Sequence, residues 1–311
     1  MLKKKAINRI FITTMAVFVV LIFSSFKLMK NDNVIYDDAY YINNNDEVIL
    51  YTINNDNFVT KTSVYVDNKL SIEKKIKTLL EIMIEKHNKS SLLPNNFKTI
   101  LPKNTEILDI KIEDGILKVN FSKAILNINV DSSDKMIEAI TYTLSSIPDI
   151  VGIEIYVDNI LLEYAPNTNK KLPSLLTKEY GINKTYNIDS TDNIKRVNLY
   201  YIYSTSDNDY LVPVSKYMND KREKIEIIVE ELTNKLIKEK NLKSYLSNKL
   251  FLLSYDVNIN SLKLTFNEEI IHNINEIDPL IYSIFSNYDI KKIEIYDKEN
   301  KILEKTKKDI E

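Results

Sequence analysis

The feature that most constrains the fold of this chain is an internal duplication. From Val48 onward, the apolar pattern predicts strand, strand, helix, strand, strand, helix, strand, and then the same order again. The opening strand Val48–Ile53 recurs as Val197–Ile202. Residues 140–156 align with 280–296 at a constant offset of 140 and share eight identities. The sequence therefore predicts two tandem units, each of roughly 110–120 residues and able to bury its own core.

Local signals support the same elements in both units. Ser71 is a predicted N-cap, and Asp278-Pro279 is predicted to open the last helix of the second unit as N-cap and first helical residue. Asp114-Gly115 predicts a tight hairpin turn, because both turn positions need positive φ. The apolar stripe of the first helix is predicted to contain Ile72, Ile76, Leu79, Leu80 and Met83, and that of its counterpart Ile225, Ile228, Val229, Leu232 and Leu236.

The predicted fold class is α+β. We expect two tandem α/β sandwich units of ββαββαβ type, with helices on one face of a mostly antiparallel sheet, after one N-terminal transmembrane helix. The predicted divisions are a cytoplasmic tip and anchor (1–30), a juxtamembrane linker (31–47), the first domain (48–164), a linker (165–195) and a second, divergent domain (196–311).

The N-terminus predicts a membrane anchor. Ile10–Phe26 is a run of 17 residues without a charge, and Lys3, Lys4, Lys5 and Arg9 precede it. The positive-inside rule then keeps the N-terminus in the cytoplasm and exports the rest of the chain. A cleaved signal peptide is the alternative. The anchor is favoured because no small-x-small cleavage site follows, and the absence of cysteine removes a lipoprotein attachment site.

The stretches Ile100–Ile125 and Val151–Asn159 resemble the GerMN domain family of sporulation and spore-germination proteins. The resemblance rests on four features together: Pro102-x-x-Thr105, the Asp114-Gly115 hairpin, the strand exit Val119–Lys123 and the closing strand Ile153–Asp158. The first unit carries all four. The second unit matches mainly in element order and in its final strand.

This resemblance implies an extracytoplasmic protein of the envelope of spore-forming bacteria. GerMN units are similar to the ring-building domains of transenvelope complexes, and the family offers no catalytic residues to carry over. Two departures stand out: proteins of this type are commonly lipoproteins, whereas this chain has no cysteine, and its second unit lacks the Pro-x-x-Thr and Asp-Gly signals.

Composition excludes several classes of function. Three glycines cannot supply a Gly-rich phosphate loop, and without cysteine there is no thiolate zinc site. Six of the 42 basic residues and none of the 44 acidic residues lie in residues 1–30. The remainder is therefore acidic, with both signs interspersed, which argues against nucleic acid as a partner. We expect no cofactor.

Motifs that imitate catalytic or metal sites are better explained structurally. Ser71-x-x-Lys74 and Ser206-Asp207-Asn208 match two motifs of penicillin-binding enzymes, but the third, Lys-Thr-Gly, is absent. The run Asp207–Asp209 and the pair Asp189 and Asp192 are interpreted as turns rather than calcium ligands. His87 is expected to close a helix and His272 to follow a strand. No catalytic, cofactor-binding or metal-binding residue is assigned.

Three functions remain open. The first is a non-enzymatic, membrane-anchored scaffold that binds envelope proteins, including those of a transenvelope complex. The second is a peptidoglycan- or glycan-binding module that uses Tyr200, Tyr201 and Tyr203, although alternation places Tyr201 and Tyr203 with Leu199 on one strand face, which favours a core role. The third is a wall hydrolase that uses two of the many carboxylates.

Overall fold

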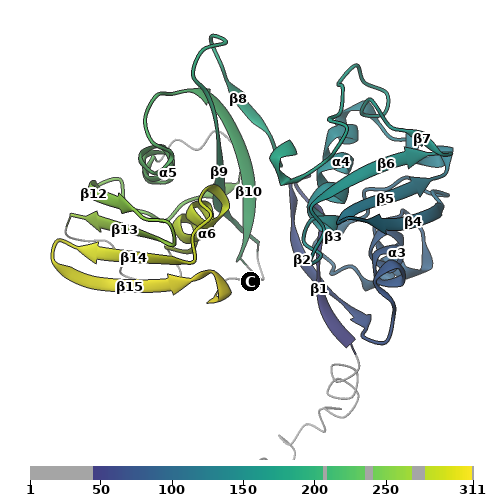
Figure 1. Ribbon diagram of the computed structural model, residues 1–311, viewed down its shortest axis with the longest axis horizontal. Helices are drawn as coiled ribbons and strands as arrows, with labels where there is room; N and C mark the ends of the chain where they lie inside the picture. Colours follow the sequence, from purple (N-terminus) through teal and green to yellow (C-terminus); the bar gives the residue numbers. More distant parts are fainter. Residues whose placement is uncertain (1–44, 206–208, 235–240, 268–276, 310–311) are drawn as a thin grey trace, which may run out of the picture. The chain divides into compact units, whose positions relative to one another are not determined.

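The structure is a computed structural model that describes residues 45–205, 209–234, 241–267 and 277–309 (Figure 1). Apart from residues 45, 46 and 67–69, these residues belong to one compact unit. The predicted anchor Ile10–Phe26 lies outside the described residues. Within the described ranges, no helix is both long enough and apolar enough to span a bilayer.

The first repeat has two helices and two sheets. Its elements are β1 (Asn45–Asn54), β2 (Val59–Asp67), α3 (Ile72–Ile82), β3 (Phe97–Lys98), β4 (Ile107–Glu113), β5 (Ile116–Phe121), α4 (Val130–Leu144), β6 (Gly152–Val157) and β7 (Ile160–Leu161). The strand orders are β2-β1-β3 and β4-β5-β6-β7. The two-residue strand β7 follows a turn in which Asp158 and Asn159 both have positive φ.

The second repeat follows the same plan. Its elements are β9 (Ile194–Ser204), β10 (Asp209–Asn219), α5 (Lys224–Thr233), β11 (Leu242–Lys243), β12 (Leu252–Val257), β13 (Ser261–Phe266), α6 (Asp278–Asn287), β14 (Lys292–Asp297) and β15 (Asn300–Thr306). The strand orders are β11-β9-β10-β8 and β12-β13-β14-β15, where β8 (Thr185–Asn187) comes from the segment between the repeats.

The α+β class is confirmed, but the expectation of one sheet in each unit was wrong. Each repeat contains two small sheets, and strands β3, β7, β11 and β15 extend the predicted order. The sheets β4–β7 and β12–β15 are mostly antiparallel, as expected, and each contains one parallel pair. β5 pairs in parallel with β6, and β13 with β14, because α4 and α6 cross over between these strands and return the chain in the same direction.

Equivalent backbone hydrogen bonds show the duplication in detail. The Tyr51 N–H donates to the Thr143 hydroxyl of α4, and the Tyr200 N–H donates to the Ser283 hydroxyl of α6, both at 2.8 Å. The bond from Val151 N to Gly115 O corresponds to that from Lys291 N to Asn260 O, both at 2.9 Å. Likewise, the bond from Asp158 N to Phe121 O (2.9 Å) corresponds to that from Lys298 N to Phe266 O (3.2 Å). The two repeats are therefore each stabilised by the same set of backbone hydrogen bonds.

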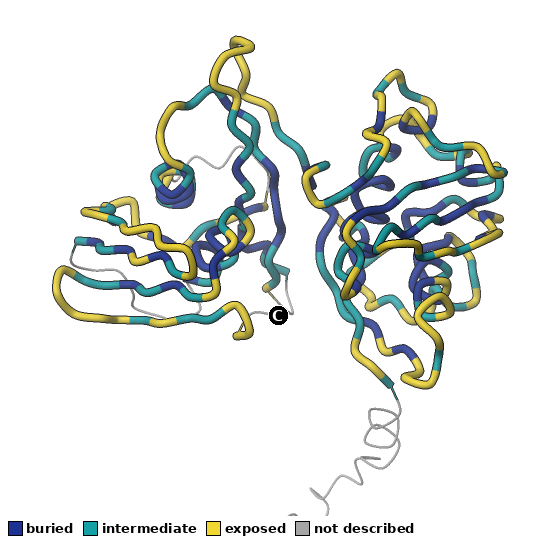
Figure 2. The backbone as a smooth tube through the Cα atoms, viewed as in Figure 1, coloured by how far each residue is buried: buried dark blue, intermediate teal, exposed yellow. Residues whose placement is uncertain are grey.

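Each repeat has its own hydrophobic core, seen as the dark blue stretches of Figure 2. Alternation along β5 buries Leu117, Val119 and Phe121, which places one face of the larger sheet on the core. Leu262, Leu264 and Phe266 do the same in β13.

The predicted helix signals are largely confirmed, with two corrections. Ser71 caps α3, since its hydroxyl accepts from Lys74 N. Ile72, expected in the apolar stripe, is 40% exposed because it lies in the first helical turn, ahead of the core contacts of Ile76. The N-cap of α6 is the fully buried Ile277, so Asp278 lies inside the first turn. Leu236 lies outside the described residues.

The segment between the repeats, residues 165–195, was expected to be a linker. Ala165, Leu172, Leu176 and Ile182 of this segment are buried in the first core. Its strand β8 pairs in parallel with β10 of the second repeat. The segment thus contributes to both repeats.

Candidate functional site

Each repeat has a groove between its first helix and the segment that leads into the edge strand, β4 or β12. In the first repeat the groove has a volume of about 490 Å³ and lies between the end of α3 and residues 103–107. In the second it has a volume of about 610 Å³ and lies between α5 and residues 248–255. The grooves are structurally equivalent, because Glu106 exchanges hydrogen bonds with Ser122 just as Phe251 does with Asn267.

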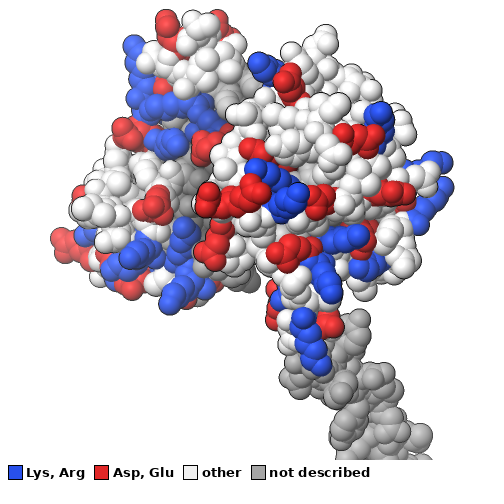
Figure 3. All heavy atoms as spheres, turned by 45° about the vertical axis from the view of Figure 1, so that its right-hand side comes forward, with Lys and Arg blue, Asp and Glu red and all other residues white. Residues whose placement is uncertain are grey.

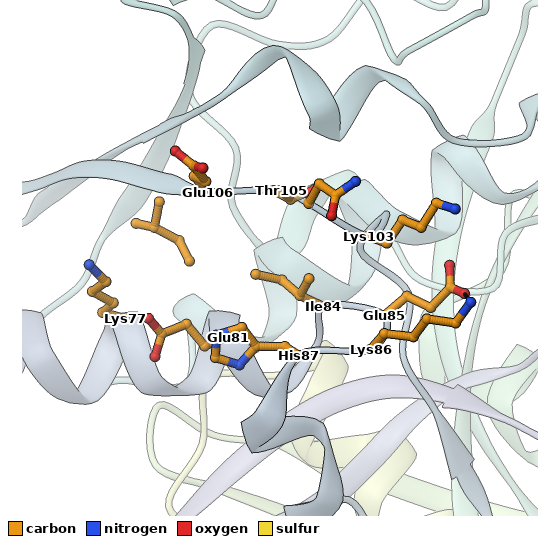
Figure 4. A pocket seen from close by; sticks show the side chains of 11 residues that line it. Lys77, Glu81, Ile84, Glu85, Lys86, His87, Lys103, Thr105 and Glu106 are labelled. Carbon is orange, nitrogen blue, oxygen red and sulfur yellow. Dashed lines mark ion pairs between the residues drawn. The ribbon is translucent and has the colours of Figure 1, made fainter.

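The first groove is polar. Figure 4 shows Lys77 and Glu81 of α3 on one side and Lys103, Thr105 and Glu106 on the other. Two of its carboxylates have ion-pair partners: the Glu81 carboxylate lies 2.6 Å from Lys89 Nζ, and Glu85 lies 3.7 Å from Lys86. The apolar contribution comes from Ile84 and Ile107.

The Pro-x-x-Thr motif forms one wall of this groove, and its role is structural. The buried Thr105 hydroxyl donates to the Pro102 carbonyl oxygen at 2.7 Å. Asn104, between them, has a φ of 64°. The motif therefore builds a tight turn that leads the chain into β4.

The other motifs of the resemblance are structural as well. Asp114 and Gly115 have φ values of 50° and 78°, which confirms the predicted hairpin turn. Within the strand exit, the Asn120 amide donates to Asn159 Oδ1 at 2.8 Å, and Asn159 N–H donates back to Asn120 Oδ1 at 3.0 Å. This pair joins the exit of β5 to the turn that follows β6.

The second groove has one apolar side. Its floor contains the buried Val229 and Leu250, and its rim contains Phe251 and Leu253, which are 61% and 58% exposed. Glu226 and Glu230 of α5 line the opposite side. Exposed aromatic and aliphatic side chains beside a groove are typical of a protein-binding surface.

The edge strands β4 and β12 also differ in the number of charged residues they carry. β4 carries Asp109, Lys111 and Glu113, and charges of this kind protect an edge from pairing with another strand. β12 occupies the equivalent edge and carries Asp256 as its one charged residue. Most of β12 is exposed, whereas the neighbouring β13 is largely buried (Figure 2).

Several residues considered as catalytic or metal-binding occupy structural positions. His87 does not close α3, which ends at Ile82, because the backbone continues into a separate short helical turn. His87 caps that turn, and its Nδ1 accepts from Lys89 N. The N–H groups of Asp189 and Asp192 donate to Asn219 Oδ1 and Ser190 Oγ, as expected of turns.

Other candidates lie outside the described residues, namely Ser206, Asp207, Asn208 and His272. In the described part of the chain, no group of three or more His, Asp or Glu side chains is arranged to hold a metal ion.

The tyrosines proposed for sugar binding are not an exposed platform. Tyr201 is 1% and Tyr203 7% exposed, so the core role favoured by strand alternation is confirmed for both. Tyr200 is half-buried and packs against Tyr282, with ring centroids 5.5 Å apart. This arrangement repeats that of Tyr51 and Tyr142 in the first repeat, at 5.4 Å.

Sequence reasoning missed a partly buried ionic network between α4 and the segment between the repeats. Lys184 Nζ lies 2.9 Å from Glu138 and 3.1 Å from Asp134, and Lys170 Nζ lies 2.7 Å from Asp134. The Tyr180 hydroxyl donates to Asp134. The spacing of Asp134 and Glu138, four residues apart on one helix, was the available signal.

Burial and pairing compete in this network. Burial raises the pKa of Glu138 above its ordinary value although Lys184 opposes the change. Burial also lowers the pKa of Lys184. For Asp134, burial is outweighed by Lys184, Lys170 and Tyr180 together, so its pKa lies below the ordinary value.

Next to this network, Asn183 connects the repeats. Its amide donates to the carbonyl oxygens of Val59 in β2 and Pro213 in β10, at 2.6 and 2.7 Å. Its Oδ1 accepts from Val59 N, and its own N–H donates to Glu138. Each polar atom of this buried side chain thus has a partner, as a specific contact between two repeats requires.

Comparisons with known proteins agree with the fold. Residues 39–163 match the family model described as Germane, sporulation and spore germination. Spore germination protein GerM of Bacillus subtilis is 25% identical over 238 residues, which are 75% of this chain and 64% of that protein. The solved structure of the tandem GerMN domains of the sporulation protein GerM from Bacillus subtilis has a TM-score of 0.75 at 21% identity, covering 82% of this chain and 92% of that structure.

Fold and grooves together define a tandem-repeat α+β protein in which one plan is used twice with different surfaces. The predicted resemblance is confirmed: residues 39–163 match the family model, and the chain is similar in sequence to GerM and in fold to its tandem GerMN domains. It spans 64% of the length of the curated relative that it matches.

Proposed function

We propose that this protein is a non-enzymatic scaffold of the bacterial envelope, related to sporulation or germination, that holds another envelope protein in the groove of its second repeat. The observation that carries the proposal is the apolar rim formed by Phe251 and Leu253. Phe251 takes the place of the charged Glu106 of the first repeat, whereas Leu253 corresponds to Leu108. The names of the relatives support the biological setting.

The groove suits an extended segment of a partner. β12 is the edge strand of its sheet, so its outer backbone groups can pair with an added strand. Apolar side chains of that strand would cover Phe251 and Leu253, whose exposed surface is otherwise in contact with water. Partners of this kind include components of a transenvelope complex.

The same proposal places the protein at the cell membrane. The predicted helix Ile10–Phe26 would anchor it once, with the N-terminus in the cytoplasm and both repeats outside. Acidic and basic side chains are interspersed on the face shown in Figure 3, which supports a protein partner over nucleic acid.

A role without catalysis is supported by what the motif residues do. Thr105, Gly115 and Asn120 build turns and strand exits. A zymogram of the full chain on peptidoglycan tests this part of the proposal. We expect no clearing, and clearing that disappears on denaturation of the protein would contradict it.

The groove itself is tested with F251S/L253S against the matched control L108S in the first repeat, where Leu108 is 47% exposed on β4. All three positions are exposed, so the fold should survive. We expect the double variant to lower the yield or germination of spores at unchanged protein level, and L108S to behave as wild type. Equal phenotypes of the two variants would contradict a role of this groove.

A further inference from the structure

We infer that Tyr186 and Tyr217 form a binding subsite for an uncharged sugar ring. The subsite is separate from the groove of the second repeat. It is a pocket of about 370 Å³ on the segment between the repeats, and Lys170, Thr177, Tyr180, Lys184, Tyr186 and Tyr217 are among its lining residues.

The two tyrosines form a built aromatic platform. β8 pairs with β10 so that Tyr186 lies directly opposite Tyr217. Their ring centroids are 5.1 Å apart and the ring planes differ by 20°, so the rings are stacked. Tyr186 is 61% exposed, which leaves the outer face of the stack open to solvent. An open aromatic face offers apolar contact to the C–H face of a pyranose ring.

Gly181 lies next to Tyr217 of this platform. A Cβ at Gly181 would lie 2.8 Å from the Tyr217 hydroxyl oxygen, so a larger residue would displace the end of this side chain. Gly181 also has a φ of 83°, which disfavours any other residue. The β8–β10 register and the stacking of the two rings place both tyrosines together, so a ligand stacked on the pair meets a preformed surface.

The charge balance of the pocket favours a neutral ligand. Its charged lining residues are all engaged in ion pairs. The pairs are Lys170 with Asp134 (2.7 Å), Lys184 with Asp134 (3.1 Å) and Glu138 (2.9 Å), and Glu179 with Arg196 (2.5 Å). Lys184 Nζ also lies 3.5 Å from the centroid of the Tyr180 ring and covers one face of it. An ionic ligand would have to compete with these internal pairs, whereas a neutral sugar leaves them intact.

Hydroxyl groups of such a sugar would find polar groups at the rim. The Lys170 side chain is 39% exposed and can donate hydrogen bonds to sugar oxygens. The shared chemistry is a neutral pyranose, and its source is either the glycan strand of peptidoglycan or a free oligosaccharide.

The probes are chitotriose, a neutral oligomer of N-acetylglucosamine, and purified peptidoglycan sacculi. Calorimetric titration of the full chain, in a detergent without a sugar headgroup, measures chitotriose binding, and cosedimentation measures retention on sacculi. We expect Tyr186→Ala to weaken binding about tenfold and Tyr186→Phe to keep it, because the stacking face remains. Tyr65→Ala, which removes a 45% exposed tyrosine from β2, is the matched control and should have no effect.

Retention on sacculi that depends on Tyr186 identifies the polymer as the source, and Tyr186-dependent binding of chitotriose alone identifies a free oligosaccharide. Binding to neither probe overturns the inference, as does binding that Tyr186→Ala leaves unchanged or that Tyr65→Ala weakens equally. The groove variant F251S/L253S should bind sugar as wild type does, which separates this inference from the proposed scaffold.

Discussion

The two repeats share the contacts that fold them and differ in the surface that borders the same groove. The Thr143 and Ser283 hydroxyls accept hydrogen bonds from equivalent strand N–H groups, those of Tyr51 and Tyr200. A bulge also occurs at equivalent places, Ile107/Asp109 in β4 and Leu252/Ser254 in β12. The groove of the first repeat is lined mainly by charged side chains, whereas that of the second has an apolar side, with Phe251 and Leu253, facing Arg222, Glu226 and Glu230.

This difference shows which residues can differ between the repeats without loss of the fold. The shared contacts use backbone groups and small hydroxyl or amide side chains, so they are present in both repeats although the groove residues differ. Charges on β4 protect an exposed edge, and their loss on β12 exposes a strand that would otherwise be an aggregation risk. The proposed partner, by covering this edge, would explain why it is tolerated.

The largest expected effect tests the equivalence of the two cores. Phe121 and Phe266 are fully buried at the ends of β5 and β13. We expect Phe121→Ala and Phe266→Ala each to lower the free energy of unfolding by about 3–5 kcal/mol, from lost burial and the cavity left behind. Urea unfolding of both variants measures this, and a small effect in one repeat alone would break the equivalence.

The ionic network packs against the first repeat and should make its stability sensitive to acid. The pKa of Asp134 is lowered in the folded state from its ordinary value of 3.8. Its ionised form therefore stabilises the protein above pH 3.8, and this stabilisation disappears as the pH falls through the folded pKa.

We expect Asp134→Asn to lower the unfolding free energy by about 2 kcal/mol at pH 7, since bonds to a charged acceptor are lost. The difference from wild type should shrink below about pH 4. Denaturant titrations at a series of pH values measure it, and a difference that grows toward acid would contradict the assignment.

The hydroxyl contacts predict smaller, matched effects. Thr143→Val and Ser283→Ala each leave a strand N–H, of Tyr51 and Tyr200, without its acceptor. We expect a loss of about 1–2 kcal/mol in each repeat. Thermal unfolding of the two single variants checks this, and effects of very different size would show that the contacts are not equivalent.

The smallest effect distinguishes the two hairpins. Gly115 has positive φ, and an added Cβ would lie 3.1 Å from the Asp149 carbonyl oxygen. We expect Gly115→Ala to cost about 1–2 kcal/mol because of its left-handed backbone. Asn260→Ala, in the equivalent turn, should change stability by less than about 0.5 kcal/mol as an ordinary surface substitution. Chemical denaturation decides, and equal losses would contradict the distinction.

The sequence predicted what local patterns determine. The duplication, the Ser71 cap and the Asp114-Gly115 turn each depend on a few neighbouring residues, and all three are present. Strands of two or three residues such as β7 and β8 leave no periodic signal, so they could not be predicted from pattern alone. The parallel pairing of β5 with β6 required knowing where α4 returns the chain.

Contacts between distant residues were also beyond prediction. Lys184 lies in a segment without periodicity, and its partners Asp134 and Glu138 precede it by about 50 residues. Tyr186 and Tyr217 meet through the short strand β8. The apolar character of residues 251–257 was visible in the sequence, but its exposure was not, because an edge strand and a buried strand have similar composition.

The central claim is that the groove of the second repeat, and not that of the first, holds a protein partner. The most direct measurement is in-cell photo-crosslinking from a benzoyl-phenylalanine placed at Leu253 or at the matched position Leu108, followed by mass spectrometry. The account predicts a discrete adduct with another envelope protein from position 253 and none from position 108. Equal adducts from both positions, or none from position 253, would contradict it.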